Sequence, residues 1–323
     1  MRRTAVLALP LSAALLAGCA SDDGADAATD AAGGEEAQRL DVLVGLYPYQ
    51  FVAERVGGDD VAVENVTPPG VEPHDVELSP QQVGAVGEAD LVLISPTFSP
   101  ALDEAVEQQR PAAVLDVLSV VDVRESGEEE AHGDEEVHAD EEAAHGEEGH
   151  DHGGEDPHVW LDPTRLATIA DAVADELAEL APERADAFRE RAAALRAELE
   201  ELDGELEQGL AQCERRDVVT SHDAFGYLTE RYGLDQVPVS GLSPEEEPSP
   251  RRLAEVATTA KERGVTTVFF EETVSPRVAE QLAREVGAKA EVLSPLEAPP
   301  EDGDYLSAMR ANLAALQEAL DCT

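Results

Sequence analysis

Residues 182–212 read PERADAFRERAAALRAELEELDGELEQGLAQ, and this stretch decides the fold. Its leucines recur at spacings of three and four residues, the period of one helical face, at Leu195, Leu199, Leu202 and Leu206. Proline fits the first turn of a helix, so Pro182 suits the start of this element. At about 1.5 Å per residue the helix would span about 45 Å. It is therefore long enough to connect two lobes.

On either side of this helix the chain alternates between short apolar runs and helical segments. Before it, apolar runs at 41–46, 61–66, 91–94 and 113–118 are separated by helices near 49–56, 80–88 and 100–109, and a helix follows at 163–180. After it, apolar runs occupy 217–221, 237–240, 266–270 and 290–293, with helices at 224–232, 250–263, 276–286 and 305–320. Such runs are typical of parallel strands buried on both faces. The sequence predicts an α/β protein of two parallel-sheet (β/α)4 lobes, joined by a long rigid helix, with a ligand cleft between them.

The beginning of the chain predicts export. Arg2 and Arg3 precede an apolar run of about 13 residues, which is shorter than the ~20 residues of a membrane-spanning helix. The run ends in Leu-Ala-Gly-Cys and looks like a lipoprotein signal, so we expect a signal peptide at 1–19 and lipidation of Cys19. Ordinary signal cleavage beside an incidental cysteine is the alternative. Residues 20–38 are almost all small or acidic, which predicts a disordered tether.

The remaining chain is divided by composition and charge. We expect an N-terminal lobe at 39–162 that includes an acidic loop at 125–156, a helical connector at 163–213 and a C-terminal lobe at 214–323.

The 22 Lys and Arg against 71 Asp and Glu give a net charge of −49, which excludes nucleic acid as a partner because two polyanions repel each other. The negative electrostatic field of the protein attracts cations. We expect a monomer.

Two cysteines remain besides Cys19. Cys213 and Cys322 belong to no C-x-x-C pair, so neither a redox motif nor a zinc-thiolate site is indicated. In an exported chain they predict a disulfide that ties the start of the second lobe to the C-terminus. Two buried free thiols are the alternative.

Eight histidines fall into two groups. Five lie in the acidic loop, at His132, His138, His145, His150 and His152. The other three, His74, His158 and His222, each lie where a strand or loop leads into a helix. One such residue would be an ordinary structural histidine, but three together predict a metal site, because imidazole is a ligand for Zn²⁺, Cu, Ni and Fe. A nearby aspartate, Asp75, Asp162 or Asp223, could orient each ring, although helix-capping aspartates would look the same.

Five motifs carry a resemblance to a known family. They are GVEPHDVELSP at 70–80, DPHVWLDP at 156–163, TSHDAFGYL at 220–228, FFEETVSP at 269–276 and DYLSAMRANL at 304–313. Together they resemble the metal-specific solute-binding proteins of ABC transporters, the TroA-like or ZnuA-like family, over nearly all of the mature chain. The resemblance implies that His74, His158 and His222 bind metal. It also implies a membrane permease with a cytoplasmic ATPase as partner, and an extracytoplasmic location on the outer face of the membrane.

The resemblance also favours one metal and a fourth ligand. Manganese-type members resemble TSE where this chain has His222 in SHD, which is typical of zinc-type members. Many relatives carry an aspartate where this chain has Ser294, but the run at 293–297 resembles a Leu-x-Pro-Leu-Glu variant in which the glutamate binds the metal. We therefore expect Zn²⁺ with Glu297 as fourth ligand. Mn²⁺ or another divalent metal, and Ser294 or water as the fourth contact, are the alternatives.

The acidic loop resembles the histidine-rich loop of zinc-type members. Its five histidines would bind Zn²⁺ weakly and raise the metal concentration near the cleft, while a plain solvated spacer is the alternative. A zinc hydrolase also uses three histidines, but the chain has no H-E-x-x-H motif and the expected carboxylate would close the fourth position. A surface adhesin is a further alternative. The sequence therefore predicts metal capture and delivery by a protein that is not an enzyme.

Overall fold

The structure, a computed structural model, describes residues 39–323 except 69, 125–154, 245–247 and 272–274. The predicted signal peptide, the lipidation of Cys19, the tether and the five loop histidines lie outside the described residues. Residues Gln38–Thr323 form one compact unit, within which two sheets define the two lobes. The lobe boundaries remain predictions.

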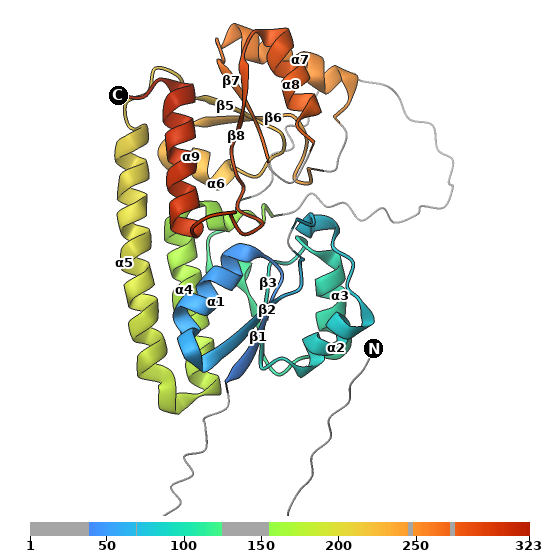
Figure 1. Ribbon diagram of the computed structural model, residues 1–323, viewed down its shortest axis with the longest axis vertical. Helices are drawn as coiled ribbons and strands as arrows, with labels where there is room; N and C mark the ends of the chain where they lie inside the picture. The colour runs from blue at the N-terminus through green and yellow to red at the C-terminus, as the bar shows by residue number, and fades with distance from the viewer. Residues whose placement is uncertain (1–38, 69, 125–154, 245–247, 272–274) are drawn as a thin grey trace, which may run out of the picture. The chain divides into compact units, whose positions relative to one another are not determined.

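The first lobe is built on a parallel sheet of four strands (Figure 1). Its strands are β1 (Leu40–Val44), β2 (Val61–Asn65), β3 (Leu91–Ile94) and β4 (Val114–Asp116), in the order β2-β1-β3-β4. Its helices are α1 (Tyr47–Gly57), α2 (Pro80–Glu88) and α3 (Pro100–Gln109). Leu91, Val92 and Leu93 are completely buried, as expected for a strand covered by helices on both faces.

The second lobe repeats this arrangement. Its strands are β5 (Asp217–Thr220), β6 (Asp235–Pro238), β7 (Thr267–Phe270) and β8 (Lys289–Val292), all parallel and in the equivalent order β6-β5-β7-β8. Its helices are α6 (Gly226–Tyr232), α7 (Pro250–Glu262), α8 (Arg277–Val286) and α9 (Tyr305–Leu320). The predicted fold class is confirmed, because two four-stranded parallel sheets with the same strand order flank a helical connector.

The connector consists of α4 (Pro163–Leu180) and α5 (Ala185–Leu210), which lie side by side (Figure 1). The long helix begins at Ala185 and not at the predicted Pro182, because Pro182–Arg184 forms a tighter 3₁₀ turn. The predicted leucine stripe is completely buried. Besides α4, helix α5 contacts α1 of the first lobe and α9 of the second. One apolar face therefore packs against both lobes, and each buried leucine contributes about 1.5–3 kcal/mol.

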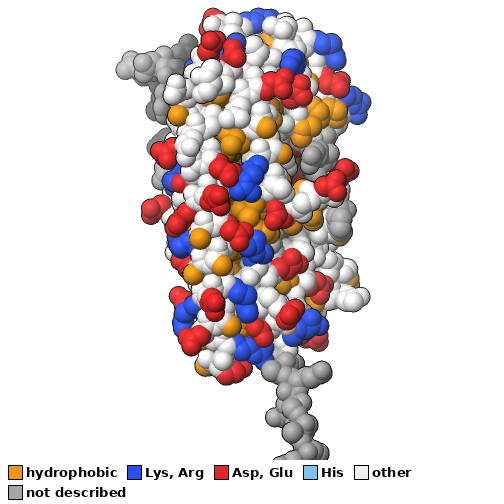
Figure 2. Space-filling model, turned by 60° about the vertical axis from the view of Figure 1, so that its left-hand side comes forward, with side chains coloured by type: hydrophobic (Ala, Val, Ile, Leu, Met, Phe, Trp, Pro, Cys, Tyr) orange, Lys and Arg blue, Asp and Glu red, His pale blue; other side chains and the backbone are white. Residues whose placement is uncertain are grey.

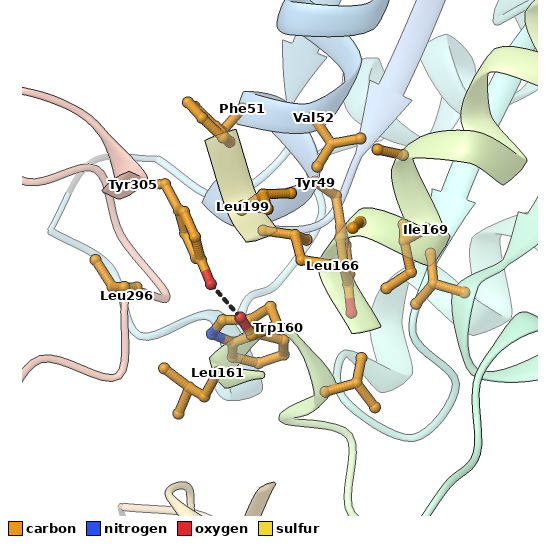
Figure 3. Packing of buried hydrophobic residues seen from close by; sticks show 14 of the residues in the cluster. Tyr49, Phe51, Val52, Trp160, Leu161, Leu166, Ile169, Leu199, Leu296 and Tyr305 are labelled. Atoms are coloured by element: carbon orange, nitrogen blue, oxygen red, sulfur yellow. Dashed lines mark hydrogen bonds between the residues drawn. The ribbon is translucent and has the colours of Figure 1, made fainter. Parts of the chain in front are cut away.

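The main hydrophobic core is continuous between the lobes. It extends from Val42 in β1 to Leu320 in α9 and includes the large aromatic side chains around Trp160 (Figure 3). Tyr49 contacts the Trp160 ring edge-on, with ring centroids 6.0 Å apart, and Phe51 stacks on Tyr305 at 5.5 Å. Because the same core covers residues of both lobes, the lobes are fixed by packing as well as by the connector.

Ion pairs add to the contacts of α5. Figure 2 shows acidic and basic side chains mixed over one face of the molecule. Helix α5 pairs with its neighbours through Glu198 with Arg55, Arg191 with Asp60, Arg196 with Asp171, and Glu205 with Arg310. Exposed pairs contribute only about 0–1 kcal/mol each, so they orient α5 and the leucine stripe supplies most of the stability.

A disulfide closes the end of the connector. Cys213 follows α5 and Cys322 follows α9, and their sulfur atoms are bonded at 1.99 Å. The backbone beside it is also paired, since Arg215 N donates to Leu320 O at 3.0 Å. The chain end is thereby tied to the start of the second lobe.

No helix among the described residues combines the length and the hydrophobicity that crossing a membrane requires.

We predict that the exported protein contains the Cys213–Cys322 disulfide in solution. The bond closes a loop with a sequence separation of 109 residues, and its removal in a Cys213→Ala/Cys322→Ala variant should lower the free energy of unfolding by up to about 4.7 kcal/mol in the chain-entropy model. Intact mass after alkylation, with and without reductant, checks the bond in protein recovered from outside the cytoplasm. Alkylation of both thiols in native, unreduced protein would contradict it.

Candidate metal centre

Four side chains from separate parts of the chain converge between the two sheets. His74 lies in a 3₁₀ turn, Pro73–Asp75, that follows β2, and His158 immediately precedes the turn Val159–Leu161. His222 follows β5, and Glu297 follows β8. One possible ligand atom from each of the four lies within 4.8 Å of all the others. The structure thus brings together the four residues that the sequence proposes as ligands, two from each lobe.

The separations fit a zinc ion. Glu297 Oε1 lies 3.7 Å from Nε2 of His74, 3.5 Å from Nε2 of His158 and 3.6 Å from Nε2 of His222. Four ligand atoms at ~2.0–2.2 Å from a tetrahedral zinc lie about 3.3–3.6 Å apart. The donor atoms therefore need to move little to bind the ion.

The same atoms are buried without hydrogen-bond partners. The side chains of His158 and His222 are 0% exposed, that of Glu297 is 1% exposed and that of His74 is 9% exposed. Within the described part of the chain, Nε2 of all three imidazoles and both oxygens of Glu297 have no hydrogen-bond partner. Each such group costs about 1–3 kcal/mol. A cation among these atoms would remove the cost, which is the strongest structural argument for a metal site.

Two carboxylates orient the buried imidazoles. Nδ1 of His158 lies 2.8 Å from Asp156 Oδ1, and Nδ1 of His222 lies 2.5 Å from Glu271 Oε1. A proton on Nδ1 leaves Nε2 free to bind a metal, so these contacts select the required tautomer. The ring of His74 instead packs on Phe98, with centroids 4.0 Å apart.

The orienting aspartates suggested by the sequence are wrong for the two buried rings. Asp162 caps α4 by accepting from Thr164 N, and it pairs with Arg165. Asp156 lies in the DPHVWLDP motif, close to His158. This proximity is the sequence signal that could have identified it as the orienting carboxylate. Glu271 is 49 residues from His222 and becomes its neighbour only because β7 pairs with β5.

Electrostatics makes the centre attractive to a cation. Burial would raise the pKa of Glu297, but the three facing imidazoles hold that pKa well below its usual range. Burial also opposes the charged form of His222, yet Glu271 and Glu297 raise its pKa to about 10. The pKa of His74 is lowered by burial. A metal ion bound at Nε2 would therefore have to displace a proton from His222, while Nδ1–H would continue to donate to Glu271.

Comparison with known proteins agrees with this geometry. Residues 42–319 match the family described as "Zinc-uptake complex component A periplasmic", ZnuA. The chain belongs to this family. The resemblance predicted from the five motifs is thereby confirmed.

Individual relatives cover the chain to different extents. It is 33% identical over 304 residues to the high-affinity zinc uptake system protein ZnuA of Bacillus subtilis, covering 91% of this chain and 92% of the relative. It is 33% identical over 330 residues to the zinc-binding lipoprotein AdcA of Streptococcus pneumoniae, but spans only 62% of that relative's length. The solved structure of the laminin-binding protein Lmb of Streptococcus agalactiae is similar with a TM-score of 0.75 and 32% identity, covering 88% of this chain and all of that one.

Ser294 does not share the position of Glu297. Its hydroxyl accepts from Leu296 N at 3.3 Å and thus supports the backbone of the segment that carries Glu297.

We predict that Glu297→Gln weakens zinc binding by about 1–3 kcal/mol, because it removes the one charged oxygen that faces all three imidazoles. Ser294→Ala should change the affinity little. Competition with a chelator measures both variants, and the reverse order of effects would move the fourth contact to Ser294 or to a water that it holds.

Proposed function

We propose that this protein captures Zn²⁺ outside the cytoplasm and delivers it to a membrane transporter. The observation that carries the proposal is the buried set of three Nε2 atoms around Glu297 Oε1, at 3.5–3.7 Å. Three neutral imidazoles and a single carboxylate suit four-coordinate Zn²⁺, whereas Mn²⁺ favours more oxygen ligands. Copper binds nitrogen sites more tightly than zinc in general, so the choice of zinc rests on geometry and on the relatives.

The names of the relatives support capture and not catalysis. One relative is named as a zinc uptake protein, and another as a zinc-binding lipoprotein. A hydrolytic zinc site keeps one position open for water. Here Glu297 occupies the fourth side of the site, facing all three imidazoles. The residues therefore enclose the ion, exclude water and exchange protons for metal.

The family supports a transporter partner, and the start of the sequence supports a lipid anchor. A component of an uptake complex implies a permease with its ATPase, and the cysteine at the end of the apolar run favours attachment to the membrane through a lipid on Cys19. We propose that the protein acts as a monomer on the outer face of the membrane. Cell fractionation checks the anchor, since Cys19→Ala should move the protein from the membrane to the soluble extracytoplasmic fraction.

We predict that protein purified without chelator or added metal retains about one zinc per chain. Replacing His74, His158 or His222 by Ala should weaken tight zinc binding roughly a hundredfold or more, since the loss of a ligand leaves other buried groups unpaired. Elemental analysis and chelator competition measure the two quantities. His145→Ala, in the acidic loop, serves as the control and should keep the tight site. Wild-type affinity in all three ligand variants would disprove the site.

We also propose that the acidic loop collects zinc near the centre. We predict that deletion of residues 128–152 leaves the tight site intact and lowers the number of weakly bound zinc ions, because this stretch holds five of the eight histidines. Isothermal titration separates the two classes of site. Loss of the tight site on deletion would instead make the loop part of the primary centre.

A further inference from the structure

Glu297 lies on a short segment that the second lobe holds by its backbone. We call residues 294–297 the ligand arm. Asn312 of α9 contacts the arm in two directions, because its Oδ1 accepts from Ser294 N at 3.0 Å and its Nδ2 donates to Ser294 O at 2.7 Å. Asn312 is 4% exposed. A buried side-chain amide thus pairs with the first residue of the arm as a neighbouring strand would.

The first lobe holds the same arm from the other side. Trp160 Nε1 donates to Pro295 O at 2.7 Å, and Tyr47 N donates to Glu297 O at 3.4 Å. Tyr305 in turn donates its hydroxyl to Trp160 O at 2.6 Å, as the dashed line in Figure 3 shows, with Leu296 nearby. The Trp160 ring lies 5.2 Å from the ring of His158. One aromatic side chain therefore contacts both a proposed zinc ligand and the arm that carries another.

The backbone of the arm adopts a conformation that it would not keep by itself. Leu296 has a φ of 61°, in the left-handed region that branched side chains avoid, and its side chain is buried in the main core. Such conformations persist only where the surrounding structure over-determines them. The side-chain hydrogen bonds from Asn312 and Trp160 are among the contacts that do so here. They fix the backbone position of Glu297 and the direction in which its side chain extends.

We propose that Asn312 and Trp160 are positioning residues that set metal selectivity by holding Glu297 in the geometry of a single-oxygen, four-coordinate ligand. The inference rests on the proposed function, because it concerns the same site. Zn²⁺ suits four coordination, whereas Mn²⁺ prefers more oxygen ligands. On a loosened arm the carboxylate can turn to offer both oxygens or admit a water, and either change raises the coordination number. Loosening therefore weakens zinc binding more than manganese binding.

The test compares two metals in a variant that releases the arm. Asn312→Leu removes both hydrogen bonds and keeps the same number of side-chain heavy atoms. We expect Zn²⁺ affinity to fall about ten- to a hundredfold, as is usual when a group that supports a ligand is lost, and Mn²⁺ affinity to fall less than about threefold. The strong visible absorption of tetrahedral Co²⁺ in the wild type should give way to the weaker absorption of a higher-coordinate ion. Fluorescence of Trp160, the single tryptophan of the chain, follows binding.

The chain offers a matched control. Asn65 is its other asparagine, and it likewise makes a side-chain contact to backbone, accepting from Thr67 N at 3.0 Å at the end of β2. Asn65→Leu should cost some stability while leaving the ratio of zinc to manganese affinity and the Co²⁺ spectrum unchanged. Trp160→Phe keeps the aromatic packing but removes the Nε1 donor, and chelator competition should show the same change of ratio as Asn312→Leu. It serves as the second variant if Asn312→Leu does not fold.

The outcomes are distinguishable. The inference is overturned if both variants keep the wild-type affinity ratio and Co²⁺ absorption, since the arm would then hold its own shape. An equal loss for both metals with an unchanged Co²⁺ spectrum would also overturn it, because the hydrogen bonds would then serve stability alone. Wild-type protein that binds no zinc would overturn the proposed function itself.

Discussion

The packing of α5 against both lobes is the constraint on which the proposed metal centre depends. Two of the proposed ligands come from each lobe, so a shift of one lobe relative to the other by even one ångström would change every separation between His74 or His158 and Glu297. The leucine stripe of α5 is completely buried against α4, and the helix also contacts α1 and α9. Close-packed side chains resist such shifts, because any movement opens voids. The ligand atoms can therefore be preorganised although they come from distant parts of the chain.

Holding the ligand atoms in place brings several buried carboxylates close together. Protons on the neighbouring histidines offset their negative charge. His158, His222, Glu297 and the orienting carboxylates Asp156 and Glu271 are buried in one place, and the partly buried His74 lies beside them. Burial would lower the pKa of His158 and His222, but the facing carboxylates raise the pKa of both and so favour protons on them. A zinc ion bound at the proposed site would replace this positive charge at the same position. At the proposed site, zinc and protons would therefore compete for the same buried atoms.

The sequence predicts those features of the fold and of the candidate site that depend on a local pattern of residues. Apolar runs between helices predict the strands to within a few residues, and the histidines stand out because His74, His158 and His222 are the three that lie outside the acidic loop. Glu297 was reached only through resemblance, since one glutamate among so many acidic residues carries no signal of its own. Glu271, Asn312 and Trp160 were missed as supporting groups. Their contacts join residues 49, 18 and 135 positions apart, and such pairs follow from strand order and core packing, which no local pattern contains.

Asp156 connects the end of the acidic loop to the proposed metal centre, so the loop and the site share one residue. Its Oδ1 orients His158, whereas its Oδ2 lies 3.2 Å from Arg124 on the other side of residues 125–154. Asp156 N donates to Arg124 O at 2.9 Å, and the Tyr227 hydroxyl donates to Asp156 O while accepting from Arg124 N. Gly226 permits this approach, because a Cβ there would lie 1.5 Å from Arg124 Nη1. The two flanks are thus held together by contacts that do not involve the intervening residues, so the length and charge of the loop can change while His158 keeps its orientation.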